Sequence, residues 1–196
     1  MTCIIGYIDE KGVGHMAGDT AGTSVDGHYR VDNVHAKVFR NGEMLIGYTS
    51  SFRMGQILEH VFTAPERNDG LTDYQYMVKQ VVPAIRKAFV EGNYMTKEDK
   101  DGGTFLIIYR GKLFALQDDF SVFERPRNFD SCGSGFIASN TAFETMLEFG
   151  LVSHLGVREA LVKAIEITSR TNITVSGRVD YLNSNGESWA REALHR

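Results

Sequence analysis

The sequence predicts an α+β fold of four layers, an αββα sandwich in which two antiparallel sheets stack face to face and a pair of helices covers each outer face. Three observations predict it. The expected strands come in hairpins joined by short turns, helical segments come in pairs after each group of strands, and the strand–helix–strand alternation of a parallel sheet is absent. Stacked sheets flanked by helices would bury all of these apolar faces.

The first strands are expected as two hairpins. Residues 2–8 are mostly apolar and residues 13–19 are rich in small residues, and a polar turn joins them. Residues 20–27 are rich in Thr, Gly and Ser, so we expect a polar loop there. The second hairpin spans residues 37–49, because Asn41-Gly42 suits a two-residue type I′ turn between two apolar runs.

Two helical segments follow. Apolar residues within 52–62 fall on one helical face, and those within 72–90 recur at steps of three and four residues. Pro83 lies inside the second pattern, so we expect a kink there. Both helices carry apolar residues on more than one side, which indicates a contact between subunits. The residues that suggest this second apolar side include Tyr74, Tyr76 and Met77.

The second half of the chain repeats the order of strands and then helices. The expected strands are residues 104–109, 113–117, 120–124 and 129–132, the first two joined by a turn at Gly111-Lys112. The expected helices are residues 136–149 and 157–167. Val175 and residues 179–182 are expected to close a sheet, and the polar tail from Asn183 is expected to be loosely held.

Length and composition limit the class of protein. We expect one domain over residues 1–196, with a hydrophobic content of 42% that suffices for a sizeable core. The net charge is −4 and no basic run occurs, which argues against nucleic acid as a partner. No apolar run is long enough to cross a membrane, and no signal peptide is evident, so a cytoplasmic location is expected. Cys3 and Cys132 are expected to be small core residues, and no metal site is predicted.

Thr2 is a candidate nucleophile. If Met1 were removed, Thr2 would carry a free α-amine beside its hydroxyl. An N-terminal threonine can use this amine as the base that activates the hydroxyl. The apolar strand that follows would hold the end of the chain rigidly within a sheet.

Five segments, in this order and spacing, make the chain resemble a known family. They are Thr2-Cys3-Ile4-Ile5, Met16-Ala17-Gly18-Asp19, His35-Ala36-Lys37-Val38, Leu45-Ile46-Gly47-Tyr48 and Gly133-Ser134-Gly135. The chain resembles the proteasome β-subunit family of N-terminal nucleophile (Ntn) hydrolases, and bacterial HslV looks most similar. The resemblance implies the αββα fold of these enzymes, in agreement with the elements expected above.

The resemblance also implies how Thr2 would be activated. Thr2, freed by loss of Met1, matches the family nucleophile, whose hydroxyl oxygen attacks the carbonyl carbon of the bond to be cut. Lys37 matches the lysine beside that hydroxyl, where a cation favours the alkoxide and lowers the pKa of the neighbouring amine. Asp19 matches the aspartate that pairs with this lysine, and Ser134 matches the serine that hydrogen-bonds the terminal amine.

Four further positions follow from the same resemblance. The backbone N–H of Ser50 falls where the family has its oxyanion donor, usually a glycine. Tyr48 would line the pocket for the residue before the cut. Asn172 takes the place of an aspartate that the family often has there, and with Ser176 it would support the terminal amine. The chemistry requires neither a metal nor an organic cofactor.

The implied function is that of a threonine endopeptidase that hydrolyses unfolded polypeptides inside a self-compartmentalising homo-oligomeric ring. By resemblance, a separate ATP-dependent unfoldase would be its partner. Two alternatives stay open. Asn172 and the altered segment after Thr49 are compatible with a catalytically silent structural subunit of such a ring, and an Ntn amidase that acts on a small amide would need the same catalytic residues.

Overall fold

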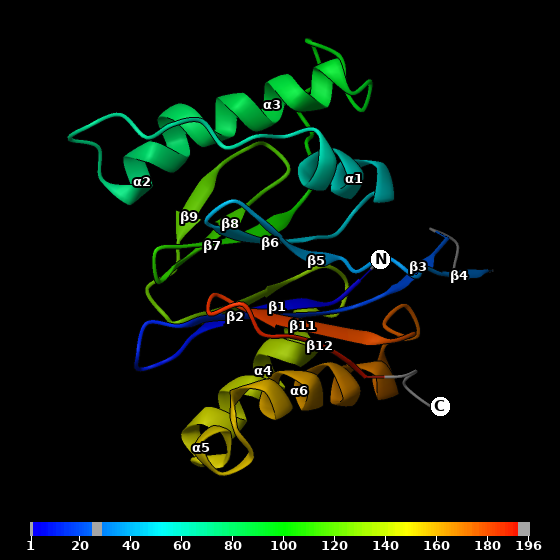
Figure 1. Cartoon of the computed structure of the whole chain (residues 1–196). Coiled ribbons are helices and arrows are strands. Elements are labelled where there is room, and N and C mark those ends of the chain that lie inside the picture. The colour runs from blue at the N-terminus through cyan, green and yellow to red at the C-terminus, as the bar shows by residue number, and fades with distance from the viewer. Residues whose placement is uncertain (1, 25–28, 192–196) are drawn as a thin grey trace.

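The predicted four layers are present in the computed structural model, which describes residues 2–24 and 29–191 of the chain. A helical layer, two sheets and a second helical layer stack in that order (Figure 1). The predicted α+β sandwich is therefore confirmed. Within these described ranges, every helix is too short or too polar to cross a lipid bilayer.

The first large sheet has the strand order β10-β1-β2-β11-β12, and all neighbours are antiparallel. Its strands are β1 (Ile4–Ile8), β2 (Gly14–Asp19), β10 (Phe129–Cys132), β11 (Val179–Asn183) and β12 (Ser188–Arg191). β1 and β2 are buried at every position, because the second sheet covers one face and helices cover the other. The Asp19 amide donates to the Cys3 carbonyl at 3.2 Å, so the start of β1 and the end of β2 lie side by side at the same end of the sheet.

The second large sheet has the strand order β5-β6-β7-β8-β9. Its strands are β5 (Val38–Asn41), β6 (Met44–Tyr48), β7 (Phe105–Tyr109), β8 (Lys112–Leu116) and β9 (Val122–Glu124). The predicted type I′ turn at Asn41-Gly42 is wrong by one residue. The central residues are Gly42 and Glu43, and of these only Gly42 has a positive φ, 58°, as in a type II′ turn. Asn41 stays in the strand because its side-chain amide donates to the carbonyls of Leu58 and Phe62.

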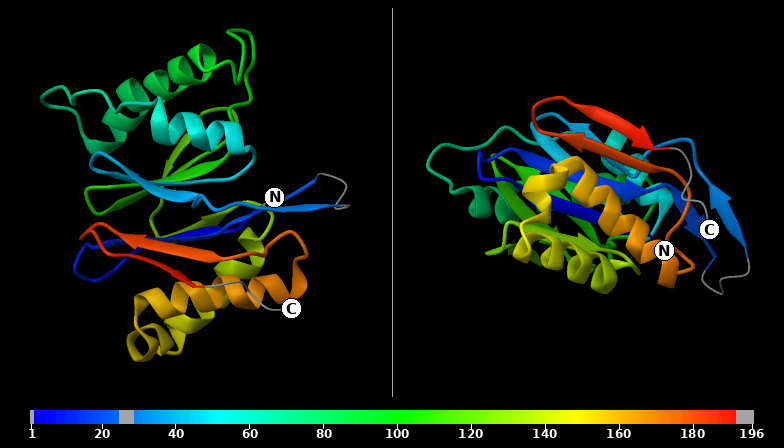
Figure 2. Two further views of the ribbon diagram at one scale, coloured as in Figure 1. Left: turned by 45° about the vertical axis from the view of Figure 1, so that its right-hand side comes forward. Right: turned by 90° about the horizontal axis from the view of Figure 1, so that it is seen from below.

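Helices cover both sheets, as the two views in Figure 2 show. The helices over the second sheet are α1 (Phe52–His60), α2 (Asp73–Tyr76), the π-helical turn η1 (Met77–Val81) and α3 (Val82–Glu91). Those over the first sheet are α4 (Phe136–Glu148), α5 (Leu151–Leu155) and α6 (Val157–Thr171). Pro83 lies inside a continuous helical run over residues 73–91, directly after the π-helical turn η1, whose wider turn accommodates a residue that has no N–H to donate.

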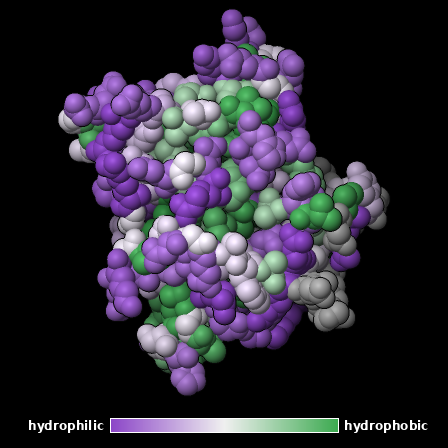
Figure 3. Space-filling model, viewed as in Figure 1, coloured by the Kyte–Doolittle hydropathy of each residue, from purple (hydrophilic) through white to green (hydrophobic). Residues whose placement is uncertain are grey.

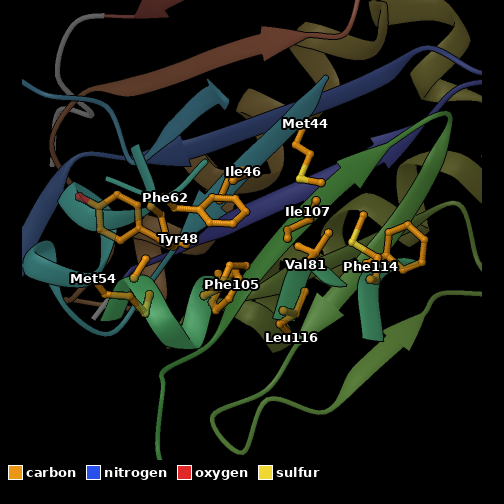
Figure 4. Close-up of a cluster of buried hydrophobic side chains, with 14 of the residues drawn as sticks. Met44, Ile46, Tyr48, Met54, Phe62, Val81, Phe105, Ile107, Phe114 and Leu116 are labelled. Atoms are coloured by element: carbon orange, nitrogen blue, oxygen red, sulfur yellow. The ribbon is translucent and has the colours of Figure 1, made fainter. Parts of the chain in front are cut away.

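Three apolar clusters fill the spaces between the layers. One lies between α1–α3 and the second sheet (Figure 4), one lies between α4–α6 and the first sheet, and a third lies between the sheets. Tyr76 and Met77, which were predicted on a free apolar side, are 3% and 0% exposed and belong to the first cluster. That prediction was wrong for these two residues, whereas Tyr74 is 43% exposed.

The structure differs from the sequence prediction in three local features. A polar loop was expected over residues 20–27, but Ala21–Thr23 forms β3 and pairs with β4 (Arg30–Asp32) in a ribbon that projects from the sandwich (Figure 1). Residues 25–27 of that expected loop lie outside the described ranges. Helix α5 was not foreseen either, and Val175 is buried in a loop and not in a strand.

The chain after Asn183 was expected to be loosely held, but strand β12 pairs with β11. Its Trp189 ring contacts two cations, with the guanidinium carbons of Arg158 and Arg191 at 5.3 and 5.2 Å from the ring centroid. Arg191 also pairs with Glu159 at 2.7 Å. These contacts with α6 order a segment whose polar composition alone suggested the opposite.

Candidate active site

The structure brings Thr2 and Lys37 together. Thr2 precedes β1, Lys37 precedes β5, and their side chains are 3% and 2% exposed. The Lys37 Nζ donates to Thr2 Oγ1 at 2.6 Å. A lysine usually keeps its ammonium in water, so a buried lysine that bonds a hydroxyl indicates a site built for that hydroxyl.

Lys37 has three oxygen partners, which match the three donors of an ammonium. Besides Thr2 Oγ1, its Nζ lies 2.5 Å from the carbonyl oxygen of Ala21 and 3.5 Å from Asp19 Oδ1. The Phe52 ring also faces the ammonium, with its centroid 5.7 Å away. The carbonyl of Ala21 was missed by sequence reasoning, since backbone groups carry no signal in the sequence.

Asp19 ends β2 and is wholly buried. Its Oδ1 accepts from the Cys3 amide at 2.9 Å, and its Oδ2 accepts from the Ser176 amide at 3.2 Å. The carboxylate therefore joins three segments, the start of β1, the lysine and the loop before β11. Its position fixes both the residue after Thr2 and the cation beside Thr2.

Burial and mutual attraction oppose each other in this pair. Burial lowers the pKa of the Lys37 ammonium below its ordinary value, and the Asp19 carboxylate counteracts that shift. Burial likewise raises the pKa of Asp19, opposed by Lys37 and by the amides of Cys3 and Ser176. Burial also raises the pKa of the Cys3 thiol to about 12, so this thiol is no nucleophile near neutral pH.

Ser134 lies between β10 and α4, in a loop that touches Thr2. Its Oγ is 3.4 Å from the Thr2 carbonyl oxygen and 2.6 Å from Thr174 Oγ1. The preceding Gly133 has φ 93°, and a Cβ placed on it would lie 2.2 Å from the Thr2 carbonyl oxygen. Glycine is needed there because the loop passes directly over Thr2. Ser134 therefore lies beside Thr2, but its contact is with the carbonyl oxygen, and a hydrogen bond from Ser134 to the terminal amine stays a prediction.

Asn172, at the end of α6, contacts Ser134 by two routes. Its Nδ2 donates to the Ser134 carbonyl at 2.8 Å, and its Oδ1 accepts from the Thr174 hydroxyl at 2.7 Å. Sequence reasoning missed Thr174, although an Asn-x-Thr segment at a helix end is a known local turn pattern. Ser176 does not join this group. It bonds Asp19 through its amide, and its buried Oγ has no hydrogen-bond partner among the described residues.

The segment after β6 carries Ser50 in a left-handed conformation, with φ 60°. The amide of Thr49 donates to Thr104 and that of Ser51 donates to Thr49, whereas the Ser50 N–H meets no acceptor in the described part of the chain. A non-glycine residue in this conformation costs on the order of 1 kcal/mol or more. Ser50 is exposed, so this N–H is open to an oxygen from outside the chain, and its predicted role as oxyanion donor stays a prediction.

A cavity of about 260 Å³ opens beside Thr2 and Lys37. Its other lining residues are Gly22, Thr23, Ser24, Tyr29, Val31, Tyr48, Thr49, Ser50, Ser51 and Phe52. Tyr48 is only 4% exposed, and burial raises the pKa of its phenol. A second cavity of about 470 Å³ shares Thr23, Thr49 and Ser50 with the first and extends to Ser134.

Among the described residues, no cluster of His, Cys, Asp or Glu is suited to hold a metal ion.

Comparison with solved structures shows that the chain has a proteasome-like fold. BPH of Thiobacillus denitrificans, in complex with epoxomicin, superposes with a TM-score of 0.72 at 16% identity, covering 100% of both chains. HslV from Trypanosoma brucei gives 0.64 at 14% identity, covering 93% of this chain and 98% of its own.

Anbu from Yersinia bercovieri, an ancestral beta-subunit, gives a TM-score of 0.64 at 11% identity and covers 98% of this chain and 87% of its own. No family model and no curated protein sequence matches the chain. Identities this low show the fold alone. The fold is thus the proteasome-like αββα sandwich that the resemblance implied.

Proposed function

We propose that the chain is a threonine-type peptidase that cuts peptide bonds with Thr2 as its N-terminal nucleophile after removal of Met1. One observation carries the proposal. The Lys37 ammonium lies 2.6 Å from Thr2 Oγ1 in a site where both side chains are nearly inaccessible to water. A buried cation at this distance stabilises the hydroxyl oxygen as it loses its proton.

The reaction follows from these positions. The free α-amine of Thr2 takes the hydroxyl proton while Oγ1 forms a bond to the substrate carbonyl carbon. The resulting oxyanion accepts a hydrogen bond from the Ser50 N–H. When the tetrahedral intermediate collapses, the C–N bond breaks and the ammonium of Thr2 returns the proton to the leaving amine. Water, activated by the same amine, then hydrolyses the ester. Lys37 keeps its charge throughout, and no cofactor takes part.

The cavity beside Thr2 suits an apolar side chain. Phe52, Tyr48 and Val31 are among its lining residues, as is Lys37, whose ammonium is already bonded to the Ala21 carbonyl. We assign this cavity to the residue before the cut. Tyr48 forms the wall nearest the second sheet, where its ring packs 6.2 Å from that of Phe39.

We also propose that copies of the chain assemble into a ring that encloses the Thr2 sites, admits unfolded polypeptide and receives it from a separate ATP-dependent unfoldase. A neighbour of the same fold, Anbu of Pseudomonas aeruginosa, forms a helical assembly, which supports self-association of such chains but not a closed ring in particular. Apolar side chains also gather on the projecting ribbon and near α5 (Figure 3), including Val31, Val34 and Phe149 at 51%, 77% and 72% exposure. Static light scattering tests this: a stable 21.9 kDa monomer at micromolar concentration contradicts it.

Two other functions are favoured by particular observations. Ser50 and Asn172 replace residues that the family usually has, which favours a catalytically silent structural subunit. The first cavity, at about 260 Å³, is small enough to favour an Ntn amidase that acts on a small amide. Turnover of fluorogenic peptides and of small amides by the purified protein separates the three. We expect peptide turnover, intact-mass loss of Met1, and loss of turnover in Thr2→Ala.

A further inference from the structure

Arg178, which immediately precedes β11, bonds the two segments that lead into and out of the projecting β3–β4 ribbon. Its backbone N–H donates to Thr20 Oγ1 at 2.9 Å, and its carbonyl accepts from the Thr20 amide at 3.0 Å. Its guanidinium donates to the Val34 carbonyl at 3.0 Å. Thr20 lies directly before β3 and Val34 follows β4, so this one residue holds the two ends of the ribbon together.

The guanidinium of Arg178 is itself held by Asp180, on β11. Arg178 Nε donates to Asp180 Oδ1 at 2.6 Å and Nη2 donates to Oδ2 at 2.9 Å, which is a bidentate pair. The second proton of Nη2 is the one that Val34 accepts. Asp180 is buried, so water competes little for this pair. A lysine in place of Arg178 has no planar fork and could not make the same set of bonds.

Each of the two segments that Arg178 bonds also carries one partner of the Lys37–Ala21 hydrogen bond. The residue directly after the first contact is Ala21, whose carbonyl accepts from the Lys37 ammonium. Lys37 itself lies three residues after Val34. Among the described residues, the bond to the Val34 carbonyl is the only hydrogen bond that joins residues 33–36 to another part of the chain. The approach of the chain to Lys37 is therefore fixed by Arg178.

We propose that Arg178 is a positioning residue for catalysis, which fixes the two segments relative to each other and so holds the Lys37 ammonium against Thr2 Oγ1. Asp180 fixes Arg178 in turn. The inference rests on the proposed function, because it requires that Lys37 activate Thr2. A misplacement of about 1 Å at a reacting group can lower a rate by about a hundredfold, so loss of this contact has a measurable effect.

The pKa of Lys37 provides a readout that a merely structural role would not change. Burial lowers it, and the groups that raise it are the Asp19 carboxylate on β2 and the Cys3 thiol before β1. The pair of Arg178 and Asp180 is not among these influences. If Lys37 moves away from its oxygen acceptors, its ammonium is less stabilised and its pKa falls further. Loss of the positive charge of Arg178 alone would act in the opposite direction.

Two variants and a chemical rescue test the proposal. Arg178→Ala should lower kcat/KM by about tenfold to a hundredfold, chiefly through kcat, and should move the alkaline limb to lower pH. Arg178→Lys keeps the charge without the fork, so it should recover little of the loss. Guanidinium chloride, too dilute to unfold the chain, should raise kcat/KM of Arg178→Ala by at least about threefold, and ammonium chloride should not. In the control Arg127→Ala, which removes a bridge between two exposed side chains, we expect neither loss nor rescue.

A second variant covers the case in which Arg178→Ala does not fold because Asp180 has lost its cation. Arg178→Met/Asp180→Asn removes both charges but still leaves the Val34 carbonyl without its donor, so the same loss and the same shift are expected. The proposal is overturned if the folded variants keep kcat/KM within about twofold, if the alkaline limb stays or moves to higher pH, or if guanidinium restores nothing.

The ¹³C shift of Lys37 Cε, titrated without substrate and assigned with Lys37→Met, reports the pKa of this lysine independently of turnover. A fall of this pKa in Arg178→Ala supports the positioning role, and an unchanged pKa contradicts it. If the unchanged chain cuts no peptide while the pKa of Lys37 still falls in Arg178→Ala, the proposed function alone is refuted.

Discussion

The Nζ of Lys37 lies 2.6 Å from Oγ1 of Thr2, and Asp19 Oδ1 lies 3.5 Å from the same ammonium. Thr2 and Lys37 are 35 residues apart in the sequence, so their contact depends on the tertiary fold. They meet because β1 and β5 belong to different sheets that stack face to face, and both residues precede their strands at the same end of the sandwich. The charge pair is thus part of the packing between the two sheets.

The first prediction concerns stability and activity at this pair. Lys37→Met leaves the Asp19 carboxylate buried without its cation, so it should lower the free energy of unfolding by about 3–5 kcal/mol and abolish turnover. The double variant Lys37→Met/Asp19→Asn removes both charges and should recover much of the stability but none of the activity. Urea denaturation measures the first effect and peptide turnover the second.

The control for this pair is Lys163→Met, which breaks a bridge to Glu166 on the surface of α6 where the lysine is 42% exposed. It should cost less than about 1 kcal/mol. A double variant as unstable as Lys37→Met, or one that regains turnover, would refute the assigned roles of the two charges.

The second prediction is a pH effect. Burial lowers the pKa of Lys37, and the Asp19 charge is the main influence that raises it again. Asp19→Asn removes this main raising influence while burial continues to lower the pKa, so Lys37 loses its proton at a lower pH than before. Because the charged lysine is the active form, the alkaline limb of kcat/KM should move to lower pH in this variant. An alkaline limb that stays where it was, in stopped assays across pH 6 to 10, argues against a cationic Lys37 in catalysis.

The third prediction concerns the glycine above Thr2. Gly133→Ala must place its Cβ within 2.2 Å of the Thr2 carbonyl oxygen and adopt φ 93°. Gly150→Ala also requires a positive φ, 69°, but has open space around its Cβ. We expect Gly150→Ala to cost about 1 kcal/mol and to keep full activity, and Gly133→Ala to cost at least twice that and to lose activity. Equal effects of the two variants would show that Gly133 is needed only for its positive φ and not for the close approach to Thr2.

The fourth prediction separates the backbone of Ser50 from its side chain. Ser50→Gly keeps the N–H and relieves the strain of φ 60°, so activity should stay within about threefold and stability should be unchanged or rise by up to about 1 kcal/mol. A loss of about a hundredfold would be the size expected for a missing oxyanion donor, and would assign that role to the serine hydroxyl. Kinetics with one peptide substrate and a thermal melt suffice.

Apolar patterning was sufficient to predict the layers. The proximity of Thr2, Asp19 and Lys37 was predicted from the family resemblance and not from the pattern, and the structure brings the three side chains together. The pattern did not predict β3 or β12, whose residues are polar and become ordered only through pairing and through cations on Trp189. Thr174 and the carbonyl of Ala21 were also missed. Both act through contacts between loops, and the periodicity of apolar residues carries no information about such contacts.

The central claim is that Thr2 is an activated N-terminal nucleophile, and the most direct test is its covalent labelling. The purified protein is treated with an electrophile that esterifies N-terminal threonines, with epoxomicin as a second probe, and the adduct is located by peptide mass spectrometry. We predict loss of Met1, one adduct per chain on Thr2, and no adduct in Thr2→Ala or in Lys37→Met. A folded protein that retains Met1, or that begins with Thr2 and stays unlabelled, would contradict the claim.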